Sequence, residues 1–154
     1  MATAMVRKAA TPDVDALVDL RAEMFAAMGV AGAGEQWRDH ARRWFVERLD
    51  DPDYCLAVVE VDGSVVSCAT GAIRDAAPSP GVPDGRDVLI SNVCTAPDHR
   101  GRGYGQAAFD AVMTWARQTG VGRAELMATG AGRGMYVRAG FRETAFPAMR
   151  ASLG

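Results

Sequence analysis

The sequence predicts one domain of the mixed α/β class, in which a mostly antiparallel sheet carries helices on both faces. The order of segments is the first observation: strand, two helices, three strands, helix, strand, helix and two last strands. A hairpin meander that leads into a β-α-β unit is typical of such a sheet. The second observation is size, because 154 residues that are 49% hydrophobic suit a single core spanning residues 1–154.

The first third of the chain predicts a short strand and two helices. Met5–Lys8 has strand character. Thr11-Pro12-Asp13 has the features of a helix start, with a hydroxyl cap and a proline in the first turn, and this helix runs to about Met28. A second helix is expected from Glu35 to Leu49, where Asp50-Asp51-Pro52 stops it.

The middle of the chain predicts a hairpin and a third strand. Tyr54–Val61 is apolar and β-branched, and Asp62-Gly63 is a strong hairpin turn before the return strand Ser64–Arg74. A loop rich in proline and glycine follows, and Asp87–Thr95 is the next strand.

The last third predicts two helices and three strands. Gly103–Thr119 has helical apolar spacing, and Arg123–Thr129 is expected to be a strand. Gly132–Ala139 is expected to be a short helix. The two last strands are expected at Phe141–Thr144 and Ala148–Ala151.

Composition excludes several classes of function. The net charge of −2 and pI near 5.7 leave no basic field for nucleic acid or an anionic membrane. No run approaches the ~20 apolar residues of a membrane helix, and the N-terminus lacks the apolar stretch of a signal peptide. Cys55, Cys68 and Cys94 are odd in number and sit in apolar runs, which indicates buried free thiols. We therefore expect a cytoplasmic protein, with neither nucleic acid nor membrane as a partner.

A glycine-rich loop is the most informative segment. The strand Asp87–Thr95 runs into a turn at Pro97, and Arg100-Gly101-Arg102-Gly103-Tyr104-Gly105-Gln106 then opens a helix. Glycines let backbone N–H groups approach a ligand closely, and the helix N-terminus adds a positive end. The loop therefore suits a phosphate, with Arg100 and Arg102 as further contacts.

Other interpretations of this loop compete. A dinucleotide fingerprint fails because Gln106 follows Gly105, and a P-loop fails because the loop has no lysine. RNA-binding Arg-Gly tracts are usually repeated within basic disordered regions, whereas this one is single and lies in an acidic chain. A tight strand-to-helix turn that uses glycine only for sharpness stays open as an alternative.

Two motifs together resemble a known family. Arg-x-x-Gly-x-Gly at Arg100–Gly105 is similar to the pyrophosphate-binding motif of the GNAT superfamily of acetyl-CoA-dependent N-acetyltransferases. Met135–Phe141 is similar to that family's Leu-Tyr-x-x-x-Gly-Phe signature. The order of elements also matches along nearly the whole chain. The resemblance implies a GNAT fold with a splayed pair of central parallel strands, acetyl-CoA (coenzyme A) as co-substrate, and an amine acceptor on a small molecule or peptide. Homodimers are common in that family.

The resemblance also implies roles for individual residues. The strand before the loop would be bulged, its backbone would hold the pantetheine arm, and the Val93 N–H would hold the thioester carbonyl oxygen and the oxyanion formed from it. Thr129 stands where many members have an asparagine that contacts the cofactor. The implied cofactor-binding residues are Val93, Cys94, Thr95, Arg100, Gly101, Arg102, Gly103, Tyr104, Gly105, Gln106 and Thr129.

Tyr136 matches the family's general acid, which protonates the departing thiolate. The alternative is that Tyr136 is a core residue of the short helix. No base is identified, although Asp87 or Asn92 would be placed to order a water that takes the proton from the amine. His40 is interpreted as a histidine of the helix surface, or a partly buried one, rather than as the base. With two histidines and no suitable cluster, no metal site is expected.

Arg21 draws attention through helical geometry rather than through the resemblance. Projection of residues 14–28 places Arg21 near the middle of an apolar face. A buried guanidinium needs an anion or a wet cleft. One explanation is a permanent ion pair, with Asp87 as one candidate. The other is that Arg21 binds a carboxylate or polar group of the acceptor, in which case the apolar wall would be Met24, Phe25, Met28 and Trp37.

The expected function is transfer of acetyl from acetyl-CoA to a primary amine, by direct attack in a ternary complex. A non-catalytic module that binds acyl-CoA or a protein partner is the alternative from another class, and a nucleic-acid-binding protein is a third. A covalent route through Cys94 is disfavoured because no partner histidine is evident. The sequence does not select one acceptor.

Overall fold

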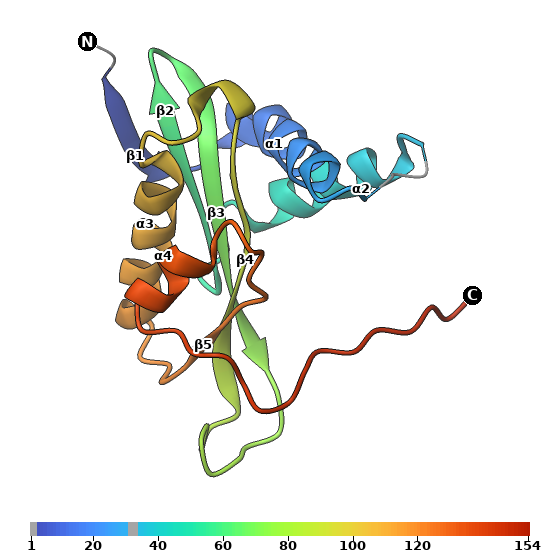
Figure 1. Cartoon of the computed structure of the whole chain (residues 1–154), viewed down its shortest axis with the longest axis vertical. Coiled ribbons are helices and arrows are strands. Elements are labelled where there is room, and N and C mark those ends of the chain that lie inside the picture. The colour runs from blue at the N-terminus through green and yellow to red at the C-terminus, as the bar shows by residue number, and fades with distance from the viewer. Residues whose placement is uncertain (1–2, 31–33) are drawn as a thin grey trace.

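The computed structural model describes residues 3–30 and 34–154. Within them a five-stranded sheet has the order β1-β2-β3-β4-β5 (Figure 1). Neighbouring strands are antiparallel except for β4 and β5, which are parallel. This mixed sheet confirms the predicted fold class. The strands are β1 (Ala4–Lys8), β2 (Tyr54–Val61), β3 (Ser64–Asp75), β4 (Arg86–Thr95) and β5 (Ala124–Glu125).

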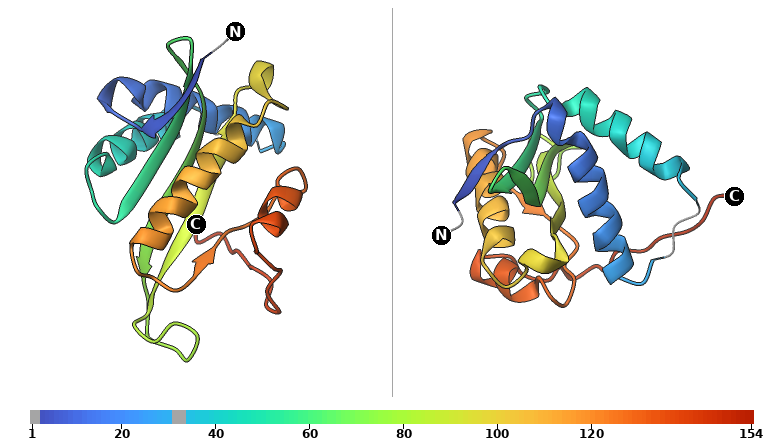
Figure 2. Two further views of the ribbon diagram at one scale, coloured as in Figure 1. Left: turned by 90° about the vertical axis from the view of Figure 1, so that its left-hand side faces the viewer. Right: turned by 90° about the horizontal axis from the view of Figure 1, so that it is seen from above.

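Helices cover both faces of the sheet, as the sequence predicts (Figure 2). Helices α1 (Val14–Ala27) and α2 (Gln36–Arg48) lie on one face. Helices α3 (Tyr104–Gln118) and α4 (Arg133–Arg138) lie on the other. Short 3₁₀ turns at Thr11–Asp13 and Pro97–His99 lead into α1 and the glycine loop.

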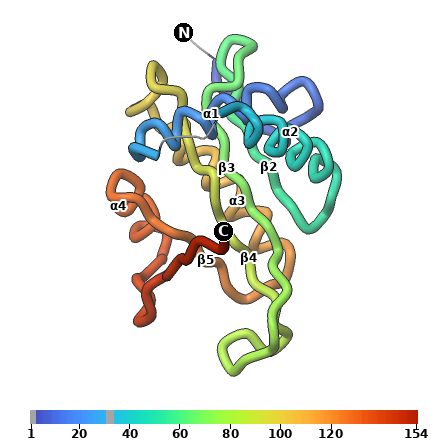
Figure 3. The backbone as a smooth tube through the Cα atoms, turned by 90° about the vertical axis from the view of Figure 1, so that its right-hand side faces the viewer, coloured from blue at the N-terminus to red at the C-terminus, as the bar shows by residue number. Residues whose placement is uncertain are grey.

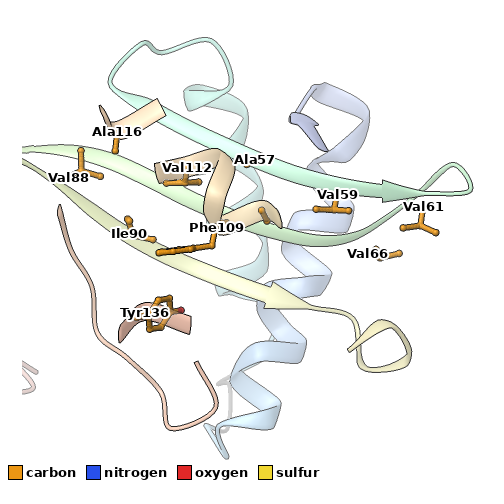
Figure 4. Packing of buried hydrophobic residues seen from close by; sticks show 12 residues of the cluster. Ala57, Val59, Val61, Val66, Val88, Ile90, Phe109, Val112, Ala116 and Tyr136 are labelled. Atoms are coloured by element: carbon orange, nitrogen blue, oxygen red, sulfur yellow. The ribbon is translucent and has the colours of Figure 1, made fainter. Parts of the chain in front are cut away.

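Alternation along β2 explains why one sheet supports two cores. Val59 and Val61 belong to the core on the α3 side (Figure 4), whereas Leu56 and Val58 pack with α1 and α2. Successive side chains of a strand point to opposite faces, so the continuous apolar run from Leu56 to Val59 buries both faces of β2. The sheet is therefore fixed from both sides, which gives β4 a rigid support.

The end of the chain differs from the prediction. The strand expected over Arg123–Thr129 is limited to Ala124–Glu125, and no strand forms at Phe141–Thr144 or Ala148–Ala151. Strands need a neighbour to satisfy their backbone groups, and a two-residue β5 presents almost no edge. Phe141 still packs against Phe109 and Tyr136. The chain beyond it runs away from the sheet (Figure 1), and its apolar side chains are exposed: Phe146 at 86%, Met149 at 93% and Leu153 at 99%.

An ion-pair cluster fixes the start of the parallel pair. Arg74 of β3 donates to both carboxylate oxygens of Asp87 on β4, at 2.9 and 2.7 Å. Arg123, just before β5, lies 3.4 Å from the same carboxylate. Asp87 is 5% exposed, and the hydrogen bonds from Arg74 hold its pKa below the usual range. The carboxylate therefore links β3, β4 and the chain entering β5.

Asp87→Asn is expected to lower the free energy of unfolding at pH 7 by roughly 1–3 kcal/mol, because a buried charged hydrogen-bond pair is lost. Since the pKa of Asp87 is lowered in the folded state, its stabilisation is present above the unfolded pKa and is lost as pH falls through the folded one. Urea unfolding at several pH values should therefore show the deficit of the variant shrinking in acid. Asp75→Asn, at the exposed end of β3, is the control. Equal stability of the two variants at pH 7 would contradict this role.

Candidate functional site

Strand β4 contains a bulge in its second half. Its register with β3 passes from the pair Thr70–Ser91 to the pair Cys68–Cys94, so β4 has one residue more than β3 in this interval. Asn92 has φ of 55°, a left-handed conformation that Asn adopts more readily than most residues. A bulge of this kind bends a strand and re-aims its side chains.

The bulge changes which face each side chain meets. Before it, Ile90 packs in the core beneath α3. Ser91 and the following Asn92 both line a pocket on the α1 and α2 side. After it, Val93 packs against the α3 side and Cys94 joins the core beneath α1. If β4 continued as a regular strand through these residues, Cys94 would share the face of Ile90.

Strands β4 and β5 separate at the same level. Their pairing is limited to Val88 with Ala124 and Leu89 with Glu125. Within the described ranges, β4 has no neighbour on its β5 side from Ile90 to Thr95. After β5 the chain turns toward α4 (Figure 3). The backbone of β4 thus borders a gap between the parallel strands at the bulge, which agrees with the splayed pair that the resemblance implies.

The glycine loop lies where β4 ends and α3 begins. Gly103 starts α3 with φ of 84°, and Gly101 has φ of 77°, both in the left-handed region where glycine costs least. A Cβ on Gly105 would lie 3.2 Å from Oγ1 of Thr95. Arg100 Nε donates to the Thr95 carbonyl at 3.2 Å, which ties the loop to the strand.

The first amides of α3 are suited to an anion. The initial N–H groups of a helix have no partner within that helix, and the glycine cap supplies no side-chain acceptor here. A phosphate is the kind of ligand that such a terminus binds. Because the Gly103 cap makes no side-chain hydrogen bond, these amides lie without a capping acceptor beside the end of β4. Arg102 is exposed, and Tyr104 and Gln106 are half-buried.

Tyr136 of α4 faces the interior beneath α3 (Figure 4). Its side chain is 8% exposed, and its ring packs edge-on against Phe109 with centroids 5.3 Å apart. Burial, and to a smaller extent Cys94 of β4, raises the pKa of the Tyr136 phenol. The phenol is therefore protonated at neutral pH. A Cβ on Gly132 would lie 2.8 Å from the Tyr136 ring, so this glycine makes room for it.

Arg21 of α1 does not form the ion pair with Asp87, which is held by Arg74 and Arg123 instead. Its Nη1 donates to Oδ1 of Asn92 at 3.2 Å. Its guanidinium lies 4.8 Å from the ring centroid of Phe25, and burial lowers the pKa of Arg21. No carboxylate among the described residues approaches the guanidinium within 4.0 Å.

A pocket of about 420 Å³ opens beside Arg21, between α1, α2, β3 and β4. Of the expected wall residues, Trp37 lines it, and Phe25 packs edge-on against Trp37 with centroids 5.9 Å apart. Met24 packs against the core and Met28 is half-exposed, so neither joins the lining. The full lining is Arg21, Trp37, His40, Ala41, Trp44, Phe45, Thr70, Ser91 and Asn92.

Sequence reasoning missed most of the contribution of α2 to this pocket. Trp37, Ala41 and Trp44 recur at helical spacing, and His40 lies on the same side, which was a readable signal. No pattern in the sequence marks Thr70 and Ser91 as pocket residues, because only the register of β3 with β4 brings them together.

Two proposed positions lie apart from the bulge. Asp87 is engaged by arginines five residues before Asn92, so the geometry gives it a structural role. Thr129 is exposed, and its hydroxyl accepts a hydrogen bond from the Gly132 amide at 3.4 Å. Across residues 3–30 and 34–154 no cluster of three metal-ligating side chains occurs. In the same ranges no helix has the length and apolar character needed to span a bilayer.

Comparison with solved structures shows the same fold elsewhere. A predicted acetyltransferase from Clostridium acetobutylicum, crystallised with acetyl-CoA, is 22% identical, with a TM-score of 0.85 over 98% of this chain and 96% of that one. A GCN5-related N-acetyltransferase from Ralstonia eutropha is 26% identical, with a TM-score of 0.81 over 97% and 99%. An aminoglycoside N-acetyltransferase in complex with CoA is 16% identical, with a TM-score of 0.78 over 100% and 97%.

A search of curated proteins gave no match. The model of the acetyltransferase (GNAT) family matches residues 14–141, which include the bulged strand, the glycine loop and Tyr136. The chain therefore belongs to the acetyltransferase (GNAT) family.

Proposed function

We propose that this protein is an acetyl-CoA-dependent N-acetyltransferase that acts on a primary amine of a small molecule or peptide. The proposal rests on three features that lie next to one another along β4. They are the unpaired edge of the strand at the bulge, the free amides at the start of α3, and the pocket on the α1 and α2 side of the sheet. Family membership and the solved relatives that hold acetyl-CoA or CoA support it.

The glycine loop would hold the pyrophosphate of acetyl-CoA. Amides from Gly101 to Gln106 supply the donors, and the α3 N-terminus supplies a favourable field. Arg100 is tied to the Thr95 carbonyl, which aligns the loop with β4. The pantetheine arm would then lie along the open edge from Val93 to Thr95, with the reactive end at the bulge.

Val93 and Tyr136 would carry the chemistry. The Val93 N–H would donate to the thioester carbonyl oxygen, and more strongly to the oxyanion that forms there. Tyr136 would protonate the thiolate as the carbon–sulfur bond breaks. Burial raises the pKa of the Tyr136 phenol, so the phenol holds its proton at neutral pH and can donate it to the thiolate that forms beside it.

The acetyl group would pass directly from acetyl-CoA to the amine, with no covalent enzyme intermediate. The acceptor ammonium first loses a proton to water, and the nitrogen lone pair then attacks the thioester carbon. A carbon–nitrogen bond forms, the carbon–sulfur bond breaks, and the sulfur takes a proton from Tyr136. The second amine proton leaves through solvent as the amide forms, and Tyr136 is reprotonated from solvent. Asn92 and Ser91 line the pocket and would order the water.

A non-catalytic module that binds acyl-CoA remains the alternative from another class. A tyrosine at position 136 together with the complete Arg-x-x-Gly-x-Gly loop favours catalysis, because binding alone requires no general acid. Thiol release from acetyl-CoA in the presence of an amine panel separates the two. Release that depends on the amine supports the enzyme, and binding without release supports the module.

Gly103→Val is expected to raise the KM for acetyl-CoA steeply, by about 10-fold or more. A β-branched residue at a left-handed φ shifts the amides that begin α3. Gly120→Val is a matched control, since Gly120 follows the other end of α3 with φ of 82° and equally open surroundings. Steady-state kinetics and melting temperatures should show equal losses of stability, with the change in KM confined to Gly103→Val. The same KM in both variants would refute the phosphate role of the loop.

Tyr136→Phe is expected to retain acetyl-CoA binding and to lower kcat by ~10²–10⁴-fold, because a general acid is lost while the ring packing stays. The measurements are calorimetric binding of acetyl-CoA and single-turnover thiol release. Phe141→Leu, in the same aromatic cluster, controls for loosened packing. Single-turnover rates close to wild type would exclude Tyr136 as the acid.

A further inference from the structure

We propose that the pocket beside the bulge selects α-amino acids with a large apolar side chain, whose carboxylate binds Arg21. The proposal rests on the proposed function and names its substrate class. It follows from three observations on the pocket lining. Among the described residues Arg21 has no carboxylate partner, the buried hydroxyl of Thr70 has no hydrogen-bond partner, and the aromatic side chains of α2 lie opposite them.

Arg21 has more hydrogen-bond donors than it uses. A guanidinium has five N–H donors, and the side-chain hydrogen bond found for it goes to the neutral Asn92 amide oxygen. Its charge is half-buried, and stacking on Phe25 compensates only in part. By contrast, Arg7, Arg74 and Arg123 each have a carboxylate partner. A ligand carboxylate would supply what Arg21 lacks, in the bidentate geometry that guanidinium favours.

Thr70 is the second, independent observation. Its residue is 2% exposed, its Oγ1 has no hydrogen-bond partner, and it lines the same pocket. Buried hydroxyls are nearly always satisfied, so a hydroxyl without a protein partner in the pocket wall is a candidate contact for a polar ligand. Thr70 pairs with Ser91 across the strands, so both residues line the pocket next to Asn92.

The distance between carboxylate and amine must be short. Arg21 contacts Asn92, and Asn92 directly precedes Val93, the residue proposed to hold the acetyl carbonyl. A carboxylate on Arg21 therefore lies close to the site of attack. A short spacer between carboxylate and amine, as in an α-amino acid, fits this placement. A long spacer between the two groups would carry the amine past the bulge.

The rest of the pocket favours an apolar side chain. Trp37 and Trp44 stand on α2 opposite the strands, and Phe45 is buried beneath them. The volume of about 420 Å³ falls in the range of small-ligand sites. The lining contains no Asp or Glu, so it offers no counter-charge to a basic side chain. Phenylalanine and leucine fit this description, whereas lysine does not.

The step would convert the amino acid and acetyl-CoA into the N-acetyl amino acid and CoA. The α-ammonium loses one proton to water, the nitrogen attacks the thioester carbon, and the thiolate leaves with the proton of Tyr136. Arg21 neither gives nor takes a proton. It is a binding residue that holds the carboxylate, so its loss should act on acceptor specificity.

The test compares acceptors that differ in one group. Thiol release from acetyl-CoA is measured with L-phenylalanine, L-phenylalaninamide and phenethylamine, and with L-lysine as the basic amino acid. We expect kcat/KM for phenylalanine to exceed that for the two carboxylate-free amines by about 10–100-fold, the value of a charged hydrogen-bonded contact. Lysine should be a poorer acceptor at its α-amino group than phenylalanine.

Substitutions of Arg21 test whether this residue causes the preference for an acceptor with a carboxylate. Arg21→Gln should bring the ratio of phenylalanine to phenethylamine close to one, and Arg21→Lys should retain part of it, because the charge stays while the bidentate fork is lost. Arg42→Gln is the control, an exposed arginine of α2 paired with Asp15 and Asp39 outside the pocket. It should leave the ratio unchanged. Melting temperatures identify any variant that fails to fold, and the acceptor comparison on the wild type needs no variant.

The outcomes separate the two levels of the proposal. Turnover of amines with no preference for a carboxylate, or a preference that survives Arg21→Gln, overturns the amino acid assignment and leaves the proposed function standing. No thiol release with any amine overturns the proposed function. In that case, quenching of Trp37 and Trp44 fluorescence by N-acetyl-L-phenylalanine, lost in Arg21→Gln, would still support carboxylate recognition, and its absence would overturn that as well.

Discussion

One extra residue in β4, between its pairs with Thr70 and Cys68 of β3, determines which side chains of this strand face the pocket and which face the α3 core. It places Ser91 and Asn92 on the same face, toward α1 and α2, and returns Val93 to the α3 side. The parallel partner β5 is paired only before this point. A single strand can therefore present its open edge to one ligand and its bulged side chains to another. An unbroken strand would direct these residues to alternate faces.

The bulge is held in place by its surroundings rather than by its own preference. A left-handed φ at Asn92 costs on the order of 1 kcal/mol. Arg21 of α1 donates a hydrogen bond to the Asn92 side chain. The residues of β4 before and after the bulge are packed into the two hydrophobic cores. The arginines on Asp87 fix where the parallel pair begins. The same arginine that contacts the bulge lines the pocket, so the proposed acceptor recognition and the strand geometry would be linked through Arg21.

Much of the fold could be predicted because its signals are local. Apolar spacing marks α1 and α3, and Asp62-Gly63 marks the hairpin between β2 and β3. The glycine loop was visible because φ values such as that of Gly103 select glycine. The two last strands were wrongly predicted, because short apolar runs such as Ala148–Ala151 form strands only beside a partner edge. Thr70 and Ser91 were missed because their meeting depends on register, which the sequence alone does not specify. Arg21 was noticed as out of place, but its true neighbour, Asn92, is 71 residues away.

The central claim is that the bulged backbone at Val93 holds the acetyl end of acetyl-CoA. It is tested most directly by following backbone amide resonances of the ¹⁵N-labelled protein during titration with acetyl-CoA and, separately, with CoA. The account predicts that the Val93 amide shifts strongly and exchanges more slowly with acetyl-CoA than with CoA, because the thioester carbonyl accepts its hydrogen bond. Amides from Gly101 to Gln106 should shift equally with both ligands, and that of buried Val58 with neither. A Val93 amide that responds identically to acetyl-CoA and CoA, while the loop amides shift, would contradict the account.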